Sequence, residues 1–260
     1  MRTYSDTFLE ENFYLRKTDH PNMLFTVNLY KLIHENKMEE FIDNFGPKIK
    51  ACNSDVVATY FAKYLGWALS GYHYILSLGD TFEFSLKNTE LQIFYDKKYD
   101  YYGLSFKIID FTLMPTLTKK PIIEDFYLNF VTPLLQTFVT SSNVKIRDLW
   151  GQVAIGVYHG HDNNLELAQT DEEKESILNF FQFITKEFKP GFFSAKRNPL
   201  DITFRMTESP TKPGELQRLK PTCCLYYQTE GATTMCFGCP RMNEEERDKR
   251  REEIRAKNAG

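Results

Sequence analysis

Four of the five cysteines lie in one short stretch near the C-terminal end of the 260-residue chain. They form an adjacent pair, Cys223 and Cys224, and a second pair after eleven intervening residues, Cys236 and Cys239. Thiolates are soft ligands, so a set of four of them selects zinc or an iron–sulfur cluster. The two residues between Cys236 and Cys239 let the chain turn around one metal atom, and Gly238 supplies the backbone freedom that we expect such a turn to need.

The adjacent pair distinguishes between the two kinds of metal site. Zinc ribbons usually repeat the two-residue spacing in both turns, whereas nothing separates Cys223 from Cys224. Neighbouring side chains diverge, so presenting both sulfurs to one Zn²⁺ would require a strained turn, while a two-iron cluster is a larger target. We therefore interpret the four cysteines as ligands of a [2Fe–2S] cluster that moves single electrons. A structural zinc site and a disulfide between Cys223 and Cys224 are the alternatives.

This segment resembles the FhuF-like ferric-siderophore reductases. Their hallmark is a Cys-Cys pair followed by a Cys-x-x-Cys unit at the C-terminal end. Here Cys223-Cys224 precedes Cys236-Phe237-Gly238-Cys239-Pro240-Arg241, and the gap of eleven residues is one longer than the commonest pattern. The resemblance covers residues 216–242. Outside that range the chain matches the family only in length, in the position of its cysteines and in lacking a membrane segment.

The resemblance implies a function. In that family the four cysteines hold a [2Fe–2S] cluster, which passes one electron to iron(III) in a siderophore complex in the cytosol. Reduction to iron(II) weakens the grip of the hard oxygen ligands, and the metal leaves. The sequence has no Gly-x-Gly-x-x-Gly after a strand and no Walker motif, so we expect an external donor, a ferredoxin or a reduced flavin. The rival interpretation is a non-enzymatic binding protein whose four cysteines hold structural zinc. A siderophore-binding relative that senses redox state is a third.

Positive charges near the cysteines are candidates for substrate binding, since ferric siderophores are often anionic. Lys220 and Arg241 flank the cysteines in the sequence, and Arg205 lies on a predicted strand close by. Lys196 and Arg197 form a further basic pair. For each of them, an ordinary surface charge is the alternative interpretation.

Composition excludes several classes of protein. The net charge of −3 gives no electrostatic case for nucleic-acid binding. The N-terminal residues lack the basic and apolar pattern of a secretory signal, so we expect a cytoplasmic protein. The apolar stretch 60–78 contains Lys63 and His73, which predicts a buried helix and no transmembrane segment. The isolated Cys52 is expected to be buried or half-buried and without chemistry.

The elements that position the cysteines can be predicted from periodicity. Apolar residues at helical spacing predict helices over 24–45 and from Asn53 or Ser54 to Gly79. Period-two alternation over 82–86, 91–95 and 104–109 predicts an antiparallel meander. Residues 201–208 are a further candidate strand, and the turn residues 209–214 follow it.

Four more helices are predicted beyond the meander. One begins at Pro121 with a kink at Pro133, and the next is capped by Asn143. Thr170 with Glu173 forms a capping box for another. The segment His159-Gly160-His161-Asp162 is expected in a loop, with no metal role. Residues 243–257 predict a terminal helix with six acidic and six basic residues, which we interpret as a solvated helix.

The sequence therefore predicts an α+β fold, mostly helical, with a small antiparallel sheet and a C-terminal cysteine-rich, cluster-binding segment. We divide the chain into a substrate-binding body, residues 1–215, and a [2Fe–2S]-binding segment with the charged terminal helix, residues 216–260. The two parts are expected to form one compact unit.

Overall fold

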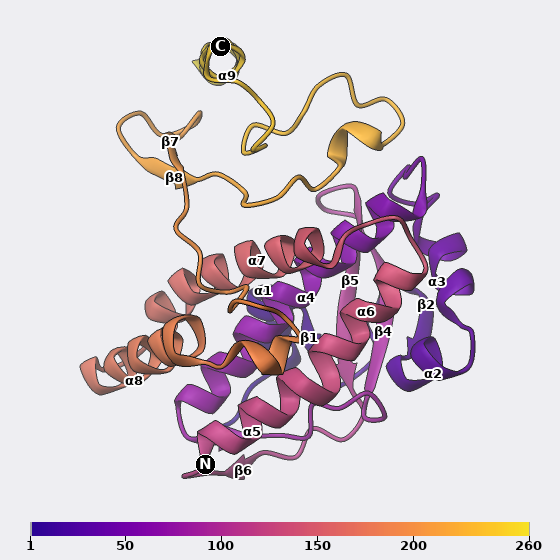
Figure 1. Ribbon diagram of the computed structural model, residues 1–260, viewed down its shortest axis with the longest axis vertical. Helices are drawn as coiled ribbons and strands as arrows, with labels where there is room; N and C mark the ends of the chain where they lie inside the picture. Colours follow the sequence, from indigo (N-terminus) through magenta and orange to yellow (C-terminus); the bar gives the residue numbers. More distant parts are fainter. Residues whose placement is uncertain (1, 260) are drawn as a thin grey trace.

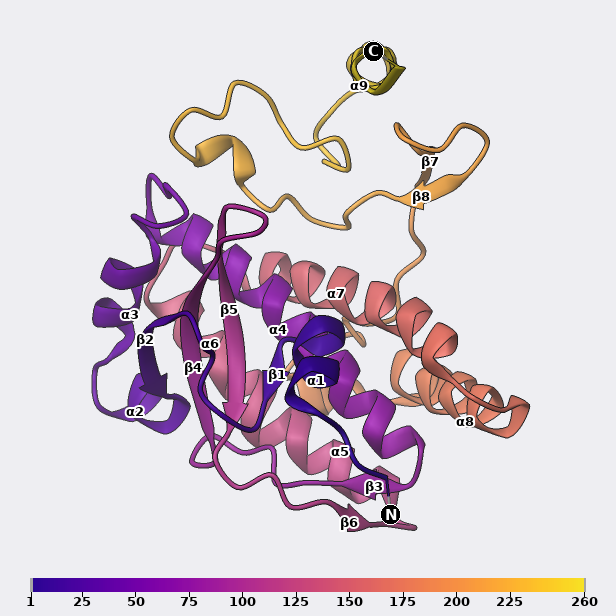
Figure 2. The same cartoon turned by 180° about the vertical axis from the view of Figure 1, so that it is seen from behind.

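A computed structural model describes residues 2–259 of the chain. The fold is α+β and mostly helical, as predicted. Two long helices, α4 (Ser54–Ser77) and α7 (Ile146–Leu167), pack along each other and form the centre of the molecule (Figure 1). A small sheet and the helix α8 (Asp171–Gln182) lie on opposite sides of this pair (Figure 2). The described part of the chain contains no helix with the length and apolar character that crossing a membrane requires.

The close approach of α4 to α7 depends on two glycines that face each other. A Cβ atom at Gly66 would lie 2.4 Å from the carbonyl oxygen of Val153, and one at Gly156 would lie 2.9 Å from the backbone of Gly66. Only glycine fits there without moving one helix. Asn53 caps the start of α4 as predicted, since its side chain accepts a hydrogen bond from the amide of Val56.

The main sheet has four strands in the order β1-β5-β4-β2. Strands β4 (Thr89–Asp96) and β5 (Tyr101–Ile108) cover most of the predicted segments 91–95 and 104–109 and pair antiparallel. Strand β1 (Leu15–Arg16) pairs parallel with β5. The predicted antiparallel sheet is therefore a mixed one, because α1 (Asp6–Phe13) returns the N-terminal chain alongside β5.

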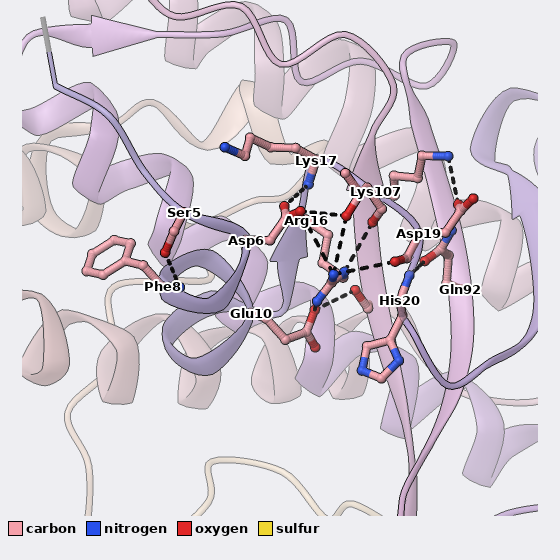
Figure 3. A network of polar contacts seen from close by, with 12 residues as sticks. Ser5, Asp6, Phe8, Glu10, Arg16, Lys17, Asp19, His20, Gln92 and Lys107 are labelled. Atoms are coloured by element: carbon pink, nitrogen blue, oxygen red, sulfur yellow. Dashed lines mark hydrogen bonds and ion pairs between the residues drawn. The ribbon is translucent and has the colours of Figure 1, made fainter.

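Polar contacts around β1 hold this short parallel strand in place (Figure 3). The guanidinium of Arg16 lies 3.9 Å from the carboxylate of Asp6 and 3.7 Å from that of Glu10 on α1. Just after β1, Asp19 forms an ion pair of 2.7 Å with Lys107 on β5. These contacts compensate for a strand of only two residues, which offers few backbone hydrogen bonds of its own.

Three sequence predictions for the N-terminal half and the linker are corrected. Residues 24–45 are not one helix but β2 (Met23–Asn28), α2 (Leu29–His34) and α3 (Met38–Phe45). Residues 82–86 form no strand, because β3 (Asp80–Thr81) pairs with β6 (Met114–Pro115) and the rings of Phe82 and Phe84 enter the core. The strand predicted over 201–208 is reduced to β7 (Met206–Glu208).

The later helices follow the predictions more closely. The kink expected at Pro133 takes the form of a π-helical turn, Tyr127–Val131, between α5 (Lys119–Phe126) and α6 (Thr132–Thr140). Thr170 caps α8, its hydroxyl accepting the amide of Glu173 at 3.2 Å. Helix α7 begins at Ile146 and not at Asn143. Because α7 is longer than expected, residues 159–162 lie inside it and not in a loop.

The last part of the chain, from Met206 onward, runs along α7 from Asp162 near its end to Asp148 near its start, and then meets the start of α4. It finishes in α9 (Glu244–Ala259), the helix furthest from the N-terminus in Figure 1. It begins with the hairpin of β7 and β8 (Leu216–Arg218). Between β8 and α9 the chain has one short 3₁₀ turn, Tyr226–Gln228, as its only helix or strand. The four clustered cysteines lie in this irregular stretch, so contacts with other elements must fix their positions.

A buried histidine makes the fold sensitive to acid. His73 on α4 is 5% exposed, and its Nε2 shares a hydrogen bond of 3.1 Å with the hydroxyl of Tyr127. Burial, with a smaller contribution from His161, lowers the pKa of His73 from 6.5 to about 3. The unfolded chain takes up this proton below pH 6.5 and the folded chain does not. The contribution of neutral His73 to the free energy of unfolding is therefore complete above pH 6.5 and is lost as the pH falls toward 3.

We predict that His73→Gln flattens the acid side of the stability profile. Each uncompensated proton costs about 1.4 kcal/mol per pH unit, so the free energy of unfolding of the parent should fall by up to that amount per unit between pH 6 and pH 4 relative to the variant. Urea unfolding at a series of pH values measures this. The exposed His34→Gln is the control and should follow the parent. Identical slopes for parent and His73→Gln would contradict the prediction.

Candidate metal centre

The structure brings the four clustered cysteines together as two pairs. The sulfurs of Cys223 and Cys239 are 3.7 Å apart, and those of Cys224 and Cys236 are also 3.7 Å apart. Three of the four are buried and Cys236 is half-buried. All are free thiols in the described chain, so Cys223 and Cys224 do not form a disulfide. Cys52 is outside the group, as predicted, but it is exposed and not buried.

The adjacent cysteines diverge, and the residue that follows them has an unusual backbone conformation. Leu225 adopts a left-handed conformation with φ of 56°, and its amide points back to the sulfur of Cys223 at 3.4 Å. Cys223 faces Cys239, whereas Cys224 faces Cys236. This is the divergence expected for neighbouring side chains. The backbone strain lies at Leu225, a residue that rarely adopts this conformation.

The second cysteine turn closes through a backbone hydrogen bond of 2.9 Å from the amide of Cys239 to the carbonyl of Cys236. Gly238 lies in this turn, but its φ is not in the left-handed region, and a Cβ atom there would meet only Lys220 Cγ, at 4.0 Å. The predicted need for glycine at this position is therefore wrong. The carbonyl of Gly238 instead accepts the amide of Lys220 at 2.9 Å and links the two cysteine turns.

Helices α4 and α7 fix the first cysteine turn. The hydroxyl of Thr59 on α4 donates to the carbonyl of Cys224 at 3.0 Å. The amide of Gln152 on α7 donates to the carbonyl of Thr222 at 2.9 Å, and both groups are buried. Gly151 leaves the space that the Thr222 side chain fills, because a Cβ atom there would lie 2.2 Å from Thr222 Oγ1. Long helices thus position a turn that has no regular structure of its own.

Helix α9 fixes the second cysteine turn through one arginine. Arg247 is 0% exposed, and its guanidinium donates to the carbonyl of Phe237, to that of Cys239 at 3.0 Å and to that of Met242 at 2.9 Å. Asn243 caps the helix as predicted, accepting the amide of Glu246 at 2.8 Å. The interpretation of α9 as a solvated helix is therefore wrong for its basic face.

The same face of α9 continues along the segment. Arg250 donates to the carbonyl of Met235, next to Cys236. One and two turns beyond Arg247, Arg251 donates to Thr207 at 3.0 Å and Arg255 to the carboxylate of Glu208 at 2.9 Å, both on β7. The equal numbers of acidic and basic residues gave no sign of this arrangement in the sequence. The acidic side chains of α9 are largely exposed, whereas these arginines contact β7 and the second cysteine turn.

Each sulfur pair has a cation beside it. The ammonium of Lys220 lies 3.0 Å from the sulfur of Cys224. Burial opposes the charge of Lys220, but negative charge on Cys224 and Cys236 outweighs it and raises the pKa of Lys220. Arg241 donates to the hydroxyl of Tyr227 at 2.9 Å, and negative charge on the nearby Cys223 raises the pKa of Arg241. Of the three predicted substrate-binding cations, Lys220 thus contacts a sulfur, and Arg241 lines one cavity together with Cys223.

Arg205 is the exception among the predicted cations. It is exposed, and its guanidinium forms no hydrogen bond or ion pair within residues 2–259. Only its backbone carbonyl contacts the segment, by accepting the amide of Leu219 at 2.9 Å. The structure therefore places its backbone beside the residue that precedes Lys220, but not its side chain at a sulfur.

The thiols differ in their ease of ionisation. A hydrogen bond with Cys236 and the charge of Lys220 together lower the pKa of Cys224, against the effect of burial. That same hydrogen bond and burial raise the pKa of Cys236. Burial raises the pKa of Cys223 as well. The pair beside Lys220 therefore contains one thiolate that forms readily and a neighbouring thiol that shares its proton.

The donor set fits a metal group with two metal atoms. Two thiolates bound to one tetrahedral metal at about 2.3 Å are about 3.8 Å apart, and each observed pair is spaced at 3.7 Å. Within residues 2–259, no three side chains of histidine, cysteine, aspartate or glutamate converge on one point as a metal site. The arrangement is two half-sites, each with two sulfurs and a cation nearby.

Comparison with known proteins adds no identification. The chain matches no protein-family model, and no curated protein matches it.

We predict that Arg247→Met loosens the second cysteine turn. Three carbonyls lose the hydrogen bond from the guanidinium, and only that of Cys239 keeps another donor, the amide of Met242. This should cost roughly 2–4 kcal/mol of local stability. Amide hydrogen exchange should therefore rise over residues 236–242, and trypsin should cut this segment faster. Lys249→Met, on the exposed face of the same helix, is the matched control. Unchanged protection in Arg247→Met would mean that the arginine does not hold the turn.

Proposed function

We propose that the four cysteines hold a [2Fe–2S] cluster, with Cys223 and Cys239 on one iron and Cys224 and Cys236 on the other. The observation that supports this assignment is the division of the sulfurs into two pairs of equal spacing. A two-iron cluster needs two thiolates on each iron, whereas a single zinc ion needs four donors around one point. The adjacency of Cys223 and Cys224 is accommodated because each serves a different iron.

We infer that the protein is a ferric-siderophore reductase. When bound, the cluster would supply one electron at a time, and that electron converts iron(III) in a siderophore to iron(II). The resemblance of residues 216–242 to the FhuF-like family supports this choice of substrate. An external donor, a ferredoxin or a reduced flavin, would supply the electron. We expect the reaction in the cytoplasm, where thiolates stay reduced.

The residues around the cysteines have definite tasks in this proposal. Lys220 and Arg241 offset the negative charge that four thiolates bring into a partly buried site. Gln152 and Thr59 hold the first turn in place, and Arg247 holds the second, so the sulfurs are arranged before a metal binds. Burial of three of the four cysteines limits the access of water and oxidants to the sulfurs.

The alternative is a non-enzymatic binding protein with structural zinc. Zinc–thiolate bonds have the same length as the bonds assumed above, so the spacing within a pair suits zinc as well. The number of metal atoms and the presence of sulfide separate the two. Protein purified without oxygen should be brown and contain two irons and two sulfides per chain. A colourless protein containing zinc and no sulfide would overturn the proposed function.

We predict that the four cysteines are all required and that the fifth is not. Replacing any one of Cys223, Cys224, Cys236 or Cys239 with serine should remove or badly destabilise the cluster, because a cluster of this type needs four thiolates. Visible absorption with iron and sulfide analysis measures the loss. Cys52→Ser is the control and should keep the parent spectrum. A complete, unchanged cluster in Cys223→Ser would contradict the assignment.

We predict that Lys220→Gln makes the bound cluster harder to reduce. Reduction adds a negative charge beside Cys224, and the ammonium at 3.0 Å from that sulfur stabilises it. Removing the ammonium should lower the midpoint potential by on the order of 50–100 mV. A dye-equilibrated redox titration measures this. Lys249→Gln on α9 is the control for loss of a charge from the same segment. Equal potentials for Lys220→Gln and Lys249→Gln would count against a role for Lys220.

A further inference from the structure

A pocket lies close to the cysteines, and none of the four cysteines lines it. It is a pocket of about 720 Å³ between the start of α7, the chain after the 3₁₀ turn Pro190–Phe193, and the residues just before Cys223. A volume of this size suits a ligand of several hundred daltons. Hereafter we call it the basic pocket, for the side chains that surround it.

The charges around the basic pocket are mostly positive and mostly unpaired. Arg147, Lys196 and Arg197 line it, and Asp201 is the one acidic residue of the lining. Asp201 is already paired with Lys186, which lies outside the lining. Lys196 and Arg197 are exposed and form no ion pair within residues 2–259. Arg147 lies 3.6 Å from the carboxylate of its neighbour Asp148, but its side chain is 84% exposed. Lys196 and Arg197 are therefore free to contact a bound anion, and the exposed guanidinium of Arg147 can reach one as well.

The wall behind these cations is apolar. Ile146, Pro199, Ile202 and Pro221 are half-buried along it, so their apolar surface is still available. The ring of Trp150 lies behind this wall and is almost fully buried. An apolar wall with a cationic rim suits a ligand that combines flat rings with negative charge.

The pocket and the cysteines share one piece of chain. Thr222 lines the pocket, and the next residue is Cys223. Thr222 is held rigidly, since its hydroxyl donates to the carbonyl of Asp148 at 2.9 Å while its own carbonyl accepts from Gln152. A ligand in the pocket would therefore lie next to the sulfur pair of Cys223 and Cys239, separated from it by a fixed stretch of backbone.

We propose that the basic pocket binds the iron complex, and that its preferred substrates are polyanionic aryl chelates of the tris-catecholate class. A tris-catecholate complex of iron(III) has three negative charges and three aromatic rings, which match the three cations and the apolar wall. A trihydroxamate complex is neutral and gains nothing from the cations. That the ligand accepts an electron rests on the proposed function. That the pocket prefers ligands with negative charge and aromatic rings rests on its lining residues.

Binding can be tested without electron transfer by using gallium(III), which has the charge and size of iron(III) but is not reduced. Two probes are titrated into the full-length protein, a gallium tris-catecholate with charge −3 and a neutral gallium trihydroxamate. Isothermal titration calorimetry at low and at high salt measures the affinities. The test variant is the triple change Arg147→Gln, Lys196→Gln, Arg197→Gln. The matched control removes three exposed lysines elsewhere: Lys31→Gln, Lys97→Gln, Lys257→Gln.

We expect the test variant to bind the tris-catecholate at least about tenfold more weakly at low salt, with the difference shrinking as salt rises. Its affinity for the trihydroxamate should stay within about twofold of the parent, and the control variant should match the parent for both probes. Ala195→Trp, which fills the pocket, should weaken both probes. Equal tris-catecholate binding by test and control variants, or no effect of Ala195→Trp, would overturn the proposal.

The outcome is independent of the cluster assignment. If the protein shows no selective binding of the gallium complexes, the proposed role of the basic pocket is rejected. The iron and sulfide analysis still tests the cluster assignment. If metal analysis finds zinc and no sulfide, the reductase function is rejected. The gallium titrations still test anion binding by the pocket.

Discussion

The buried guanidinium of Arg247 is the contact on which the C-terminal segment depends. A fully buried cation is costly unless hydrogen bonds replace its lost water. Three backbone carbonyls in or just after the second cysteine turn do so, and the carboxylate of Glu244 lies 3.2 Å from the guanidinium. The dependence is mutual. Those carbonyls lie in a stretch without helix or strand, so they need a donor as much as the arginine needs acceptors. Helix α9 is therefore part of the cysteine site.

The two cysteine turns are therefore held by different helices. The first is attached to α4 and α7, the rigid centre of the molecule, through Thr59 and Gln152. The second is attached to α9, which itself contacts the hairpin of β7 and β8. A metal group shared by both sulfur pairs would join these parts. Its binding free energy would then add to the stability of the whole segment.

Sequence reasoning succeeded where the signal was local. The clustered cysteines, the caps at Asn53, Thr170 and Asn243, and the strands β4 and β5 all follow from residues close together in the chain. It failed where a distant partner decided the outcome. Residues 24–28 became β2 because β4 offers an edge to pair with, and no local pattern reveals that edge. Arg247 looked like one more charge on a solvated helix, because its acceptors lie 5–10 residues earlier.

The cations that the sequence offered as candidates for substrate binding lie in two different surroundings. Lys220 and Arg241 lie beside the sulfurs, and each is already engaged by a sulfur or by Tyr227. A cation engaged in this way stabilises charge on the cysteines but has little freedom to accommodate substrates of different shapes. Arg147, Lys196 and Arg197 are exposed and lie at a pocket large enough for a chelate. In the function we propose, the first set therefore adjusts the potential of the electron source, and the second selects the acceptor. A chain that divides the tasks in this way can change its substrate by surface substitutions without disturbing its cysteine site.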